Sequence, residues 1–366
     1  MKKCITALLL LFTLSVTSLL ACTSADKPES ATGKTSKSSK SINDKKTDLI
    51  PVTLNEVAHS IFYAPMYVAM EKNYFEKEGI DLSLVTGFGA DKTMTAVLSG
   101  TADIGFMGSE ASIYTYNEGA HDYVVNFAQL TQRAGNFLVA RDDIKNFKWE
   151  DLKGKKVIGG RKGGMPEMVF EYILKQNHID PASDLTIDQN IDFGSTAAAF
   201  SEEKADYDFT VEFEPGATNL EKQGKGYVVA SLGTDSGYVP YTAFSAKKSY
   251  ISQHPEIIQG FTNALQKGMN YVASHTPEEI AQAIAPQFKE TKPDTITTIV
   301  SRYYEQDTWK KDLIFRQESF DLLQDILEDA GELRKRAPYK DLVTTLMPKT
   351  PQNQSKIQRF HINNKK

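Results

Sequence analysis

The sequence predicts an α/β protein built as two lobes, each with a mostly parallel sheet that is covered by helices on both faces. Short apolar strand-like runs alternate with amphipathic helical runs, first from Val52 to Gln129 and again from Trp149 to Leu232. A body of about 300 residues is long enough for two lobes of ordinary domain size. Two similar apolar stretches, Asn136–Arg141 and Tyr241–Lys247, flank the second run, and we interpret them as paired hinge strands between the lobes.

The first run contains four predicted strands with three helices between them. Pro65 falls in the first turn of the first helix, where its missing N–H costs nothing. Asp91 and Ser109 are predicted to cap the second and third helices, and Gly119 to end the third. The predicted strands are Val52–Asn55, Ile80–Val85, Asp103–Met107 and Tyr123–Gln129, and the first two helices are Ala64–Phe75 and Asp91–Leu98.

The second run repeats this alternation, and a mostly helical stretch from Lys247 to about Leu346 follows it. We therefore expect one lobe to comprise residues 50–138 and 243–350, and the other residues 139–242. The predicted strands of the second run are Lys155–Gly159, Tyr207–Glu212 and Tyr227–Leu232, and its helices are Met165–Gln176, Thr196–Glu203 and Pro215–Gln223.

The N-terminus has the layout of a secretory signal peptide, expected over residues 1–21. Lys2 and Lys3 precede an apolar run, Ile5–Leu20, which is short and rich in Thr and Ser for a membrane span. The stretch Leu19–Cys22 resembles a bacterial lipobox, in which the cysteine carries the lipid. An ordinary signal peptide with a chance cysteine is the alternative. Residues 22–49 are polar and are expected to form a disordered tether, and residues 351–366 form a basic tail.

Composition excludes several classes of function. The formal net charge of −5 gives no basic field for nucleic acid. The chain has two cysteines, Cys4 and Cys22, so the mature body has no free thiol for a disulfide, a nucleophile or a thiolate zinc site. Its six histidines include no H-x-x-x-H pair, and no G-x-S-x-G elbow or phosphate-binding loop is present. We therefore expect no enzyme activity and no cofactor.

Four stretches carry a family resemblance: Phe62–Leu82, Thr95–Ser109, Asp151–Gly160 and Val211–Gly226. They are similar to the NMT1/THI5-like and nitrate/sulfonate/taurine-type binding proteins. The resemblance implies a periplasmic-binding-protein-like fold of type II and the substrate-binding role in an ABC importer. It also implies a small-molecule ligand and a membrane permease as partners. We expect a monomer outside the cytoplasm, anchored to the membrane through the lipid on Cys22. The family's enzymes depend on a cysteine-rich cluster, which this sequence lacks after Cys22.

Small residues mark four predicted strand-to-helix turns, at 88–91, 108–110, 160–164 and 193–196. Ligands of open α/β sheets bind at the carboxyl ends of the strands, and glycine lets the backbone approach them closely. Simple turn geometry is the alternative for any one of these turns. The candidate ligand-binding residues here are Phe88, Gly89, Gly108, Ser109, Glu110, Arg161, Lys162, Gly163 and Phe193.

The loop after the first strand adds Glu56, His59, Ser60, Phe62 and Tyr63 as candidates. The resemblance implies that this loop lines the cleft. The aromatic pair could stack on a planar or methylated ligand, or instead fix the first helix onto its lobe. His59 could contact ligand, serve a structural role, or bind a divalent metal together with Glu56.

The charges of the candidate residues bear on the ligand. The candidates include three basic residues, Arg133, Arg161 and Lys162, and four acidic residues, Glu56, Glu110, Glu212 and Glu214. Carboxylates close to an oxyanion cost energy, so the set favours an amine, a pyrimidine-like or imidazole-like ring, or a zwitterion. Sulfonate or nitrate binding, divalent-metal binding and an enzyme on the same fold are the alternatives. The expected mechanism is closure of the two lobes over the ligand without chemistry.

Overall fold

The structure is a computed structural model, and it describes residues 49–192 and 194–344. The described residues fall within one compact unit. The predicted signal peptide, the lipidation site Cys22, the tether up to residue 48, Phe193 and the basic tail lie outside the described residues.

The first sheet has five strands in the order β2-β1-β3-β10-β4. β1 pairs in parallel with β2 and β3, whereas β10 runs antiparallel to β3 and β4. β3, in the middle of the sheet, and β4, at one edge, are both buried along their whole length. The strands span Ile50–Glu56 (β1), Ile80–Thr86 (β2), Ile104–Gly108 (β3), Val124–Gln129 (β4) and Thr242–Lys247 (β10).

The second sheet repeats this arrangement in the order β7-β6-β8-β5-β9. β6 is parallel to β7 and β8, and β5 is antiparallel to β8 and β9. In each sheet four strands therefore run in one direction, as predicted for a mostly parallel sheet. The fifth strand, β10 or β5, runs against them, because it begins where the chain arrives from the other sheet. The strands span Asn136–Ala140 (β5), Lys156–Ile158 (β6), Thr186–Asp188 (β7), Phe209–Phe213 (β8) and Tyr227–Ser231 (β9).

The chain passes between the sheets just before β5 and again just before β10. Residues 130–135 lead from β4 into β5, and residues 232–241 lead from β9 into β10. The crossing therefore lies at the N-terminal end of each predicted hinge stretch rather than along it. The expected lobe boundaries, at 138/139 and 242/243, fall inside β5 and β10.

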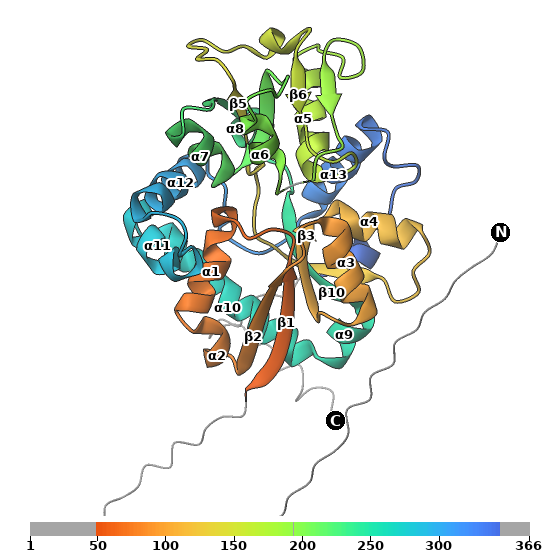
Figure 1. The fold of residues 1–366 in the computed structure, drawn as a ribbon. Helices are drawn as coiled ribbons and strands as arrows, with labels where there is room; N and C mark the ends of the chain where they lie inside the picture. Colours follow the sequence, from red (N-terminus) through yellow and green to blue (C-terminus); the bar gives the residue numbers. More distant parts are fainter. Residues whose placement is uncertain (1–48, 193, 345–366) are drawn as a thin grey trace, which may run out of the picture. The chain divides into compact units, whose positions relative to one another are not determined.

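Helices cover both faces of the first sheet, with α1 and α10 on one side and α3 on the other (Figure 1). The helix predicted over 64–75 is interrupted, because Asn73 adopts a left-handed conformation with φ of 54°. These helices span Ala64–Glu71 (α1), Tyr74–Lys77 (α2), Ala90–Ser99 (α3), Glu110–Asn117 (α4), Lys248–Gln253 (α9), Pro255–Ser274 (α10) and Pro277–Ile284 (α11).

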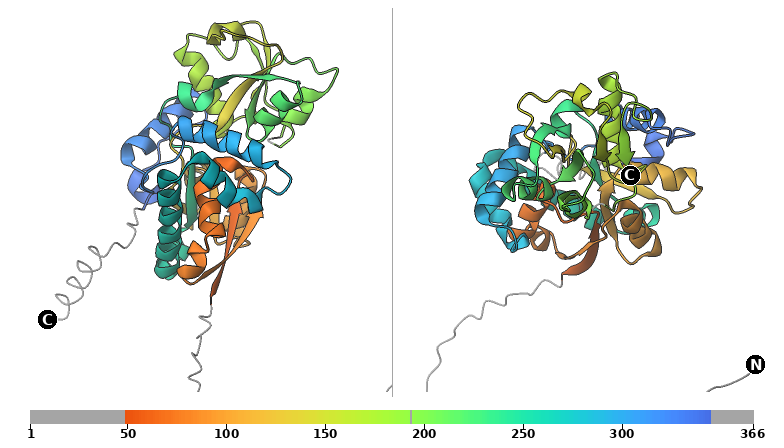
Figure 2. Two further views of the ribbon diagram at one scale, coloured as in Figure 1. Left: turned by 90° about the vertical axis from the view of Figure 1, so that its left-hand side faces the viewer. Right: turned by 45° about the horizontal axis from the view of Figure 1, so that its top comes forward.

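Of the remaining helices, α6, α7 and α8 contact strands of the second sheet, whereas α12 packs against α11 and α14 contacts β4 of the first sheet. α13 contacts both α4 and α5, and α12 contacts the short 3-10 turn η1; Figure 2 shows these C-terminal helices from the side. The helices span Met165–Gln176 (α5), Thr196–Ser201 (α6), Gly216–Lys222 (α7), Leu232–Asp235 (α8), Pro293–Glu305 (α12), Gln317–Asp329 (α13) and Tyr339–Leu342 (α14). The 3-10 turns span Ile61–Tyr63 (η1), Trp149–Leu152 (η2) and Ala285–Gln287 (η3).

One large apolar core runs from the first sheet into the second. Phe62 of η1 lies near its centre, where its ring packs 5.8 Å from Phe213 of β8 and 5.2 Å from Tyr303 of α12. The core therefore reaches the place where the two sheets meet. Within residues 49–192 and 194–344, no helix combines the length and apolar character that a membrane crossing needs.

Candidate functional site

A cavity of about 500 Å³ lies between the carboxyl-end turns of the two sheets. Its first wall comes from the turns that follow β2 and β3 and from α3 and α4. Its second wall comes from the loop between β6 and α5 and from the end of β8. Glu332, which follows α13, contributes from the C-terminal region. This volume is in the range of small-molecule sites.

The turns around the cavity bring the starts of three helices to its walls. Gly89 is the N-cap of α3, Ser109 of α4 and Gly164 of α5. Gly89 has a φ of 151°, so this position requires glycine. The predicted caps need correction: α3 begins at Ala90, ahead of Asp91, and the side chain of Ser109 makes no capping hydrogen bond.

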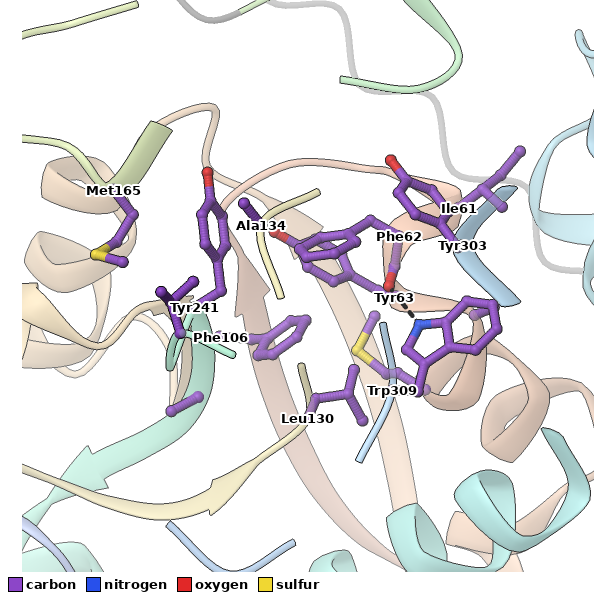
Figure 3. Close-up of a cluster of buried hydrophobic side chains, with 14 of the residues drawn as sticks. Ile61, Phe62, Tyr63, Phe106, Leu130, Ala134, Met165, Tyr241, Tyr303 and Trp309 are labelled. Atoms are coloured by element: carbon purple, nitrogen blue, oxygen red, sulfur yellow. Dashed lines mark hydrogen bonds between the residues drawn. The ribbon is translucent and has the colours of Figure 1, made fainter. Parts of the chain in front are cut away.

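Aromatic side chains form much of the cavity surface. Tyr63 of η1, Phe213 of β8 and Tyr241 before β10 line it, and Phe88 and Tyr114 add further rings. Phe62 packs behind the first three, with ring centroids 5.2 Å from Tyr63 and 5.6 Å from Tyr241. Figure 3 shows Phe62, Tyr63 and Tyr241 of this group, together with the hydrogen bond from Trp309 Nε1 to the carbonyl of Phe62. These rings offer faces for a planar or cationic ligand.

Glu110, the first residue of α4, is the most buried acid on the cavity wall, with 3 % of its surface exposed. Burial raises the pKa of its carboxyl group to about 7, against the opposing effect of the backbone N–H groups of Glu110 and Met165. Its Oε2 has no hydrogen-bond partner among the described residues. A buried carboxyl oxygen without a partner is costly unless a ligand or water satisfies it.

Polar contacts join the two walls. Arg161 Nη1 lies 3.2 Å from Asp91 Oδ1 of α3. The hydroxyl of Tyr114 on α4 donates to the carbonyl of Gly163, at 3.0 Å. Lys162 Nζ lies 3.7 Å from Glu332 Oε1. The walls are thus in direct contact around the cavity.

The cavity lining carries more acidic than basic side chains. Its two cations, Arg161 and Lys162, both form ion pairs with lining carboxylates. Glu110 has no cationic side chain as a partner within the part of the chain that the structure describes. The acidic lining residues are Asp91, Glu110, Glu118, Asp192 and Glu332.

Eight of the residues singled out from the sequence line this cavity together: Tyr63, Phe88, Gly89, Gly108, Glu110, Arg161, Lys162 and Gly163. The other described candidates are not among its lining residues: Glu56, His59, Ser60, Phe62, Ser109, Arg133, Glu212 and Glu214.

Glu56 and His59 form a separate network beside the first sheet. Glu56 is fully buried and accepts hydrogen bonds from the hydroxyls of Tyr67, at 2.6 Å, and Thr86, at 2.9 Å. His59 places Nδ1 2.8 Å from Glu56 Oε1 and Nε2 2.9 Å from the carbonyl oxygen of Gln287. Both ring nitrogens therefore face oxygen acceptors, which leaves neither directed at a metal. Within the described residues, no group of three or more metal-ligating side chains occurs.

Ser60 and Glu214 connect η1 to the end of β8. The Ser60 hydroxyl donates to the carbonyl of Glu214 at 2.9 Å. The Glu214 carboxylate accepts from the Thr218 hydroxyl at 2.8 Å and from Arg302 Nη1 at 2.8 Å. These bonds tie α7 and α12 to the junction between the sheets.

Arg133, Glu212 and Ser109 also lie close to the junction. Arg133 donates to the carbonyl of Gly233 at 3.0 Å and stacks over Tyr238, so it links the two connections between the sheets. Glu212 accepts from the hydroxyls of Thr196 and Thr210, and burial raises its pKa to about 7. Ser109 is buried, and its hydroxyl has no partner among the described residues.

The sequence interpretation did not select several lining residues. Phe213 is the last residue of β8, where the rule for the carboxyl ends of strands, applied to side chains, could have found it, whereas Tyr241 precedes β10 and falls outside that rule. Tyr114 follows Glu110 by four residues and so shares its helix face. Met165 begins α5, and nothing in the local sequence near Glu332 signals its approach to the cavity. The cavity-lining residues discussed here that the sequence interpretation did not select are Asp91, Tyr114, Met165, Phe213, Tyr241 and Glu332.

Comparison with known proteins adds three findings. A family model described as NMT1/THI5 like matches residues 61–280. YtlA of Bacillus subtilis (strain 168), which is named as a binding protein, is 47% identical over 295 residues, covering 81% of this chain and 88% of YtlA. Solved structures share the fold at much lower identity.

The alkanesulfonate-binding protein SsuA from Xanthomonas axonopodis pv. citri, bound to MOPS, has a TM-score of 0.66 at 15% identity, covering 81% of this chain and 98% of SsuA. The ligand-binding component of an ABC-type import system from Staphylococcus aureus, with zinc bound, has a TM-score of 0.64 at 16% identity, covering 81% and 96%. A further match is described as having the generic periplasmic binding protein fold. The two mixed sheets of this chain have that fold.

Proposed function

This chain belongs to the NMT1/THI5-like family, and from that premise we propose that it is the extracytoplasmic solute-binding component of an ABC importer. It would hold one small organic molecule between its two lobes and deliver it to a membrane permease. The observation that carries the proposal is the cavity of about 500 Å³ whose walls come from both sheets. A site divided in this way suits capture by closure, because a ligand that touches both walls favours the closed state.

The lining favours a solute with an amine, a pyrimidine-like ring or a zwitterionic character. The acidic side chains outnumber the basic ones, and both basic side chains are already paired. The rings of Tyr63, Phe213 and Tyr241 supply stacking surfaces for a planar or cationic group. No catalytic role is part of this proposal.

Binding of a sulfonate-type or nitrate-type anion is the second candidate. The starts of α3, α4 and α5 at the cavity favour it, because helix N-termini attract oxyanions. The SsuA structure bound to MOPS makes organic sulfonates the appropriate probes for this candidate. Zinc, present in the Staphylococcus aureus structure, is the probe for a divalent-metal candidate.

The proposed location rests on the N-terminal sequence. A signal peptide over residues 1–21 would export the chain, and a lipid on Cys22 would anchor it to the membrane as a monomer on a polar tether. Metabolic labelling with a radioactive fatty acid tests this. The wild-type chain should carry the label and sediment with membranes, whereas Cys22→Ser should do neither. Equal labelling of both chains would contradict the anchor.

Isothermal titration of the full chain tests the binding role. The panel holds amines, pyrimidines, zwitterions, sulfonates, nitrate and zinc, the last with and without a chelator. Tyr114 lines the cavity, whereas Tyr116 on the same helix bonds to Asp341 outside it. We expect Tyr114→Ala to weaken binding of the preferred solute about tenfold or more and Tyr116→Ala to leave it unchanged. If both variants bind the solute as tightly as the wild type, the solute does not bind in this cavity.

A further inference from the structure

Two helices begin on opposite walls of the cavity and direct their N-terminal ends at the same place. α4 begins at Glu110 in the first lobe, and α5 begins at Met165 in the second. Both have at least two turns, so each presents backbone N–H groups and a partial positive charge at its start. Without other groups, such a place would attract an oxyanion.

The carboxyl group of Glu110 already lies there. It folds back over Gly108, so that a Cβ on Gly108 would lie 2.6 Å from the Glu110 carboxyl carbon. The backbone N–H groups that act on this carboxyl group are its own and that of Met165, one from each helix start. The Glu110 side chain can therefore take this position only if residue 108 is glycine, and Gly108 also forms part of the cavity wall.

One oxygen of the Glu110 carboxyl group lacks a hydrogen-bond partner. Oε2 of Glu110 accepts no hydrogen bond from the described residues. The residue is nearly fully buried, with 3 % of its surface exposed, and it is one of the cavity-lining residues. The cations on the lining are committed elsewhere, Arg161 to Asp91 and Lys162 to Glu332. A buried acceptor without a partner calls for a donor, and on a residue of the cavity lining a bound ligand is the candidate donor.

We propose that Glu110 is a built-in counter-ion that determines specificity. Its carboxylate fills the anion position between the starts of α4 and α5, excludes oxyanion ligands from it, and presents Oε2 to a protonated nitrogen of the solute. This inference rests on the proposed function, since it assumes that the cavity is the solute site. It narrows the solute class to molecules with an ammonium, amidinium or protonated ring nitrogen.

The nearby groups fit such a ligand. The hydroxyl-bearing rings of Tyr63 and Tyr241 are close enough for the charge of Glu110 to affect their ionisation. They line the cavity beside it, so a cationic nitrogen held by Oε2 would also meet aromatic surface. An anionic group at the same position would meet a carboxylate within a few ångströms, which is repulsive.

A matched pair of probes tests the proposal: benzylammonium and phenylmethanesulfonate, titrated by calorimetry into the full chain. Glu110→Ser removes the carboxylate and frees both helix starts. We expect it to bind phenylmethanesulfonate about tenfold or more tighter than the wild-type chain, and benzylammonium correspondingly weaker. Glu305→Ser, which removes an exposed acid at the end of α12 outside the cavity lining, should change neither affinity by this amount.

Glu110→Gln keeps the shape of the side chain and serves as the folded comparison if Glu110→Ser is unstable. It should bind benzylammonium about tenfold or more weakly than the wild type, because the amide carries no charge. Wild-type binding of the sulfonate as tight as that of Glu110→Ser would overturn the proposal. So would benzylammonium binding that is the same in the wild type and Glu110→Gln. If instead Tyr114→Ala leaves all solute binding unchanged, the proposed function itself fails, so the two failures are distinguishable.

Discussion

Arg161 of the loop before α5 reaches Asp91 of α3 across the cavity, with 3.2 Å between Nη1 and Oδ1. Both side chains are about half exposed, so water and salt screen the pair and its contribution to stability is small. It nevertheless joins the two lobes directly. The pair is therefore expected to affect lobe closure more than folding.

Asp91→Asn should accordingly lower the free energy of unfolding by less than about 1 kcal/mol. In small-angle scattering, the ligand-free variant should show a larger radius of gyration than the wild type at low salt, and the difference should shrink at high salt. Asp143→Asn is the control, because its partner Lys145 lies in the same short segment. If the radius of gyration changes as little in Asp91→Asn as in the control, the ion pair does not hold the two lobes together.

Glu110 should make cation binding depend on pH. Burial raises the pKa of its carboxyl group to about 7, so below that pH the group is protonated and cannot form an ion pair. Affinity for benzylammonium should fall about tenfold for each pH unit below 7 and be constant above it. Calorimetry from pH 5 to 8.5 measures this. Glu110→Gln should give a flat profile, and the same slope in that variant would assign the titration to another group.

His59 should stabilise the fold at lower pH. The hydrogen bond to Glu56 raises its pKa, burial opposes the rise, and the carbonyl of Gln287 reinforces it. A raised folded-state pKa gives a stabilisation that is complete below the unfolded value of about 6.5 and disappears as pH rises through the folded value. Denaturant unfolding should show the wild-type advantage over His59→Gln decreasing from pH 5.5 to 8.5.

The control for that experiment is His121→Gln, since His121 is exposed on a loop. The difference in unfolding free energy between the wild type and His121→Gln is measured over the same pH range for comparison. A wild-type advantage over His59→Gln that grows with rising pH would contradict the charged form of His59 bridging Glu56 and Gln287.

Gly268 should be essential to the contact between α10 and α1. A Cβ at this position would clash with the carbonyl oxygen of Pro65 and lie 3.1 Å from the Cβ of Ala69. Alanine favours helix by about 1 kcal/mol over glycine, but overpacking costs typically 1–3 kcal/mol or more. Gly268→Ala should therefore destabilise the protein in thermal unfolding. Gly260→Ala on the same helix, whose nearest contact is the Glu78 side chain at 3.3 Å, should be affected less.

Much of the fold could be predicted from the sequence because its elements have clear periodic patterns. The predicted strands correspond to β1–β6 and β8–β10, including the two stretches assigned to hinges. β7 was missed, because Thr186–Asp188 has three residues, none of them fully buried, and too little pattern to recognise. The direction of β5 and β10 depends on where the chain crosses, which local patterns do not contain.

The site could be predicted only in part. Glycine turns located Gly89, Gly108 and Gly163 because strand-to-helix turns have a local signature. Glu56 and His59, three residues apart, were candidates for ligand contact, with a shared metal site as one alternative; the structure pairs them with each other, and neither is among the cavity-lining residues. Glu332 reaches the cavity only through the packing of α13 against α4 and α5, a long-range contact.

The most direct test of the central claim, that a solute is enclosed between the two lobes, is a distance between them. Spin labels on Lys92→Cys of α3 and Glu203→Cys after α6, in a chain with Cys4 and Cys22 replaced by serine, report it by pulsed electron resonance. When the protein is saturated with the solute identified by calorimetry, the distribution of label-to-label distances should become narrower and shift to shorter distances. A distribution that is unchanged at saturation would contradict the account.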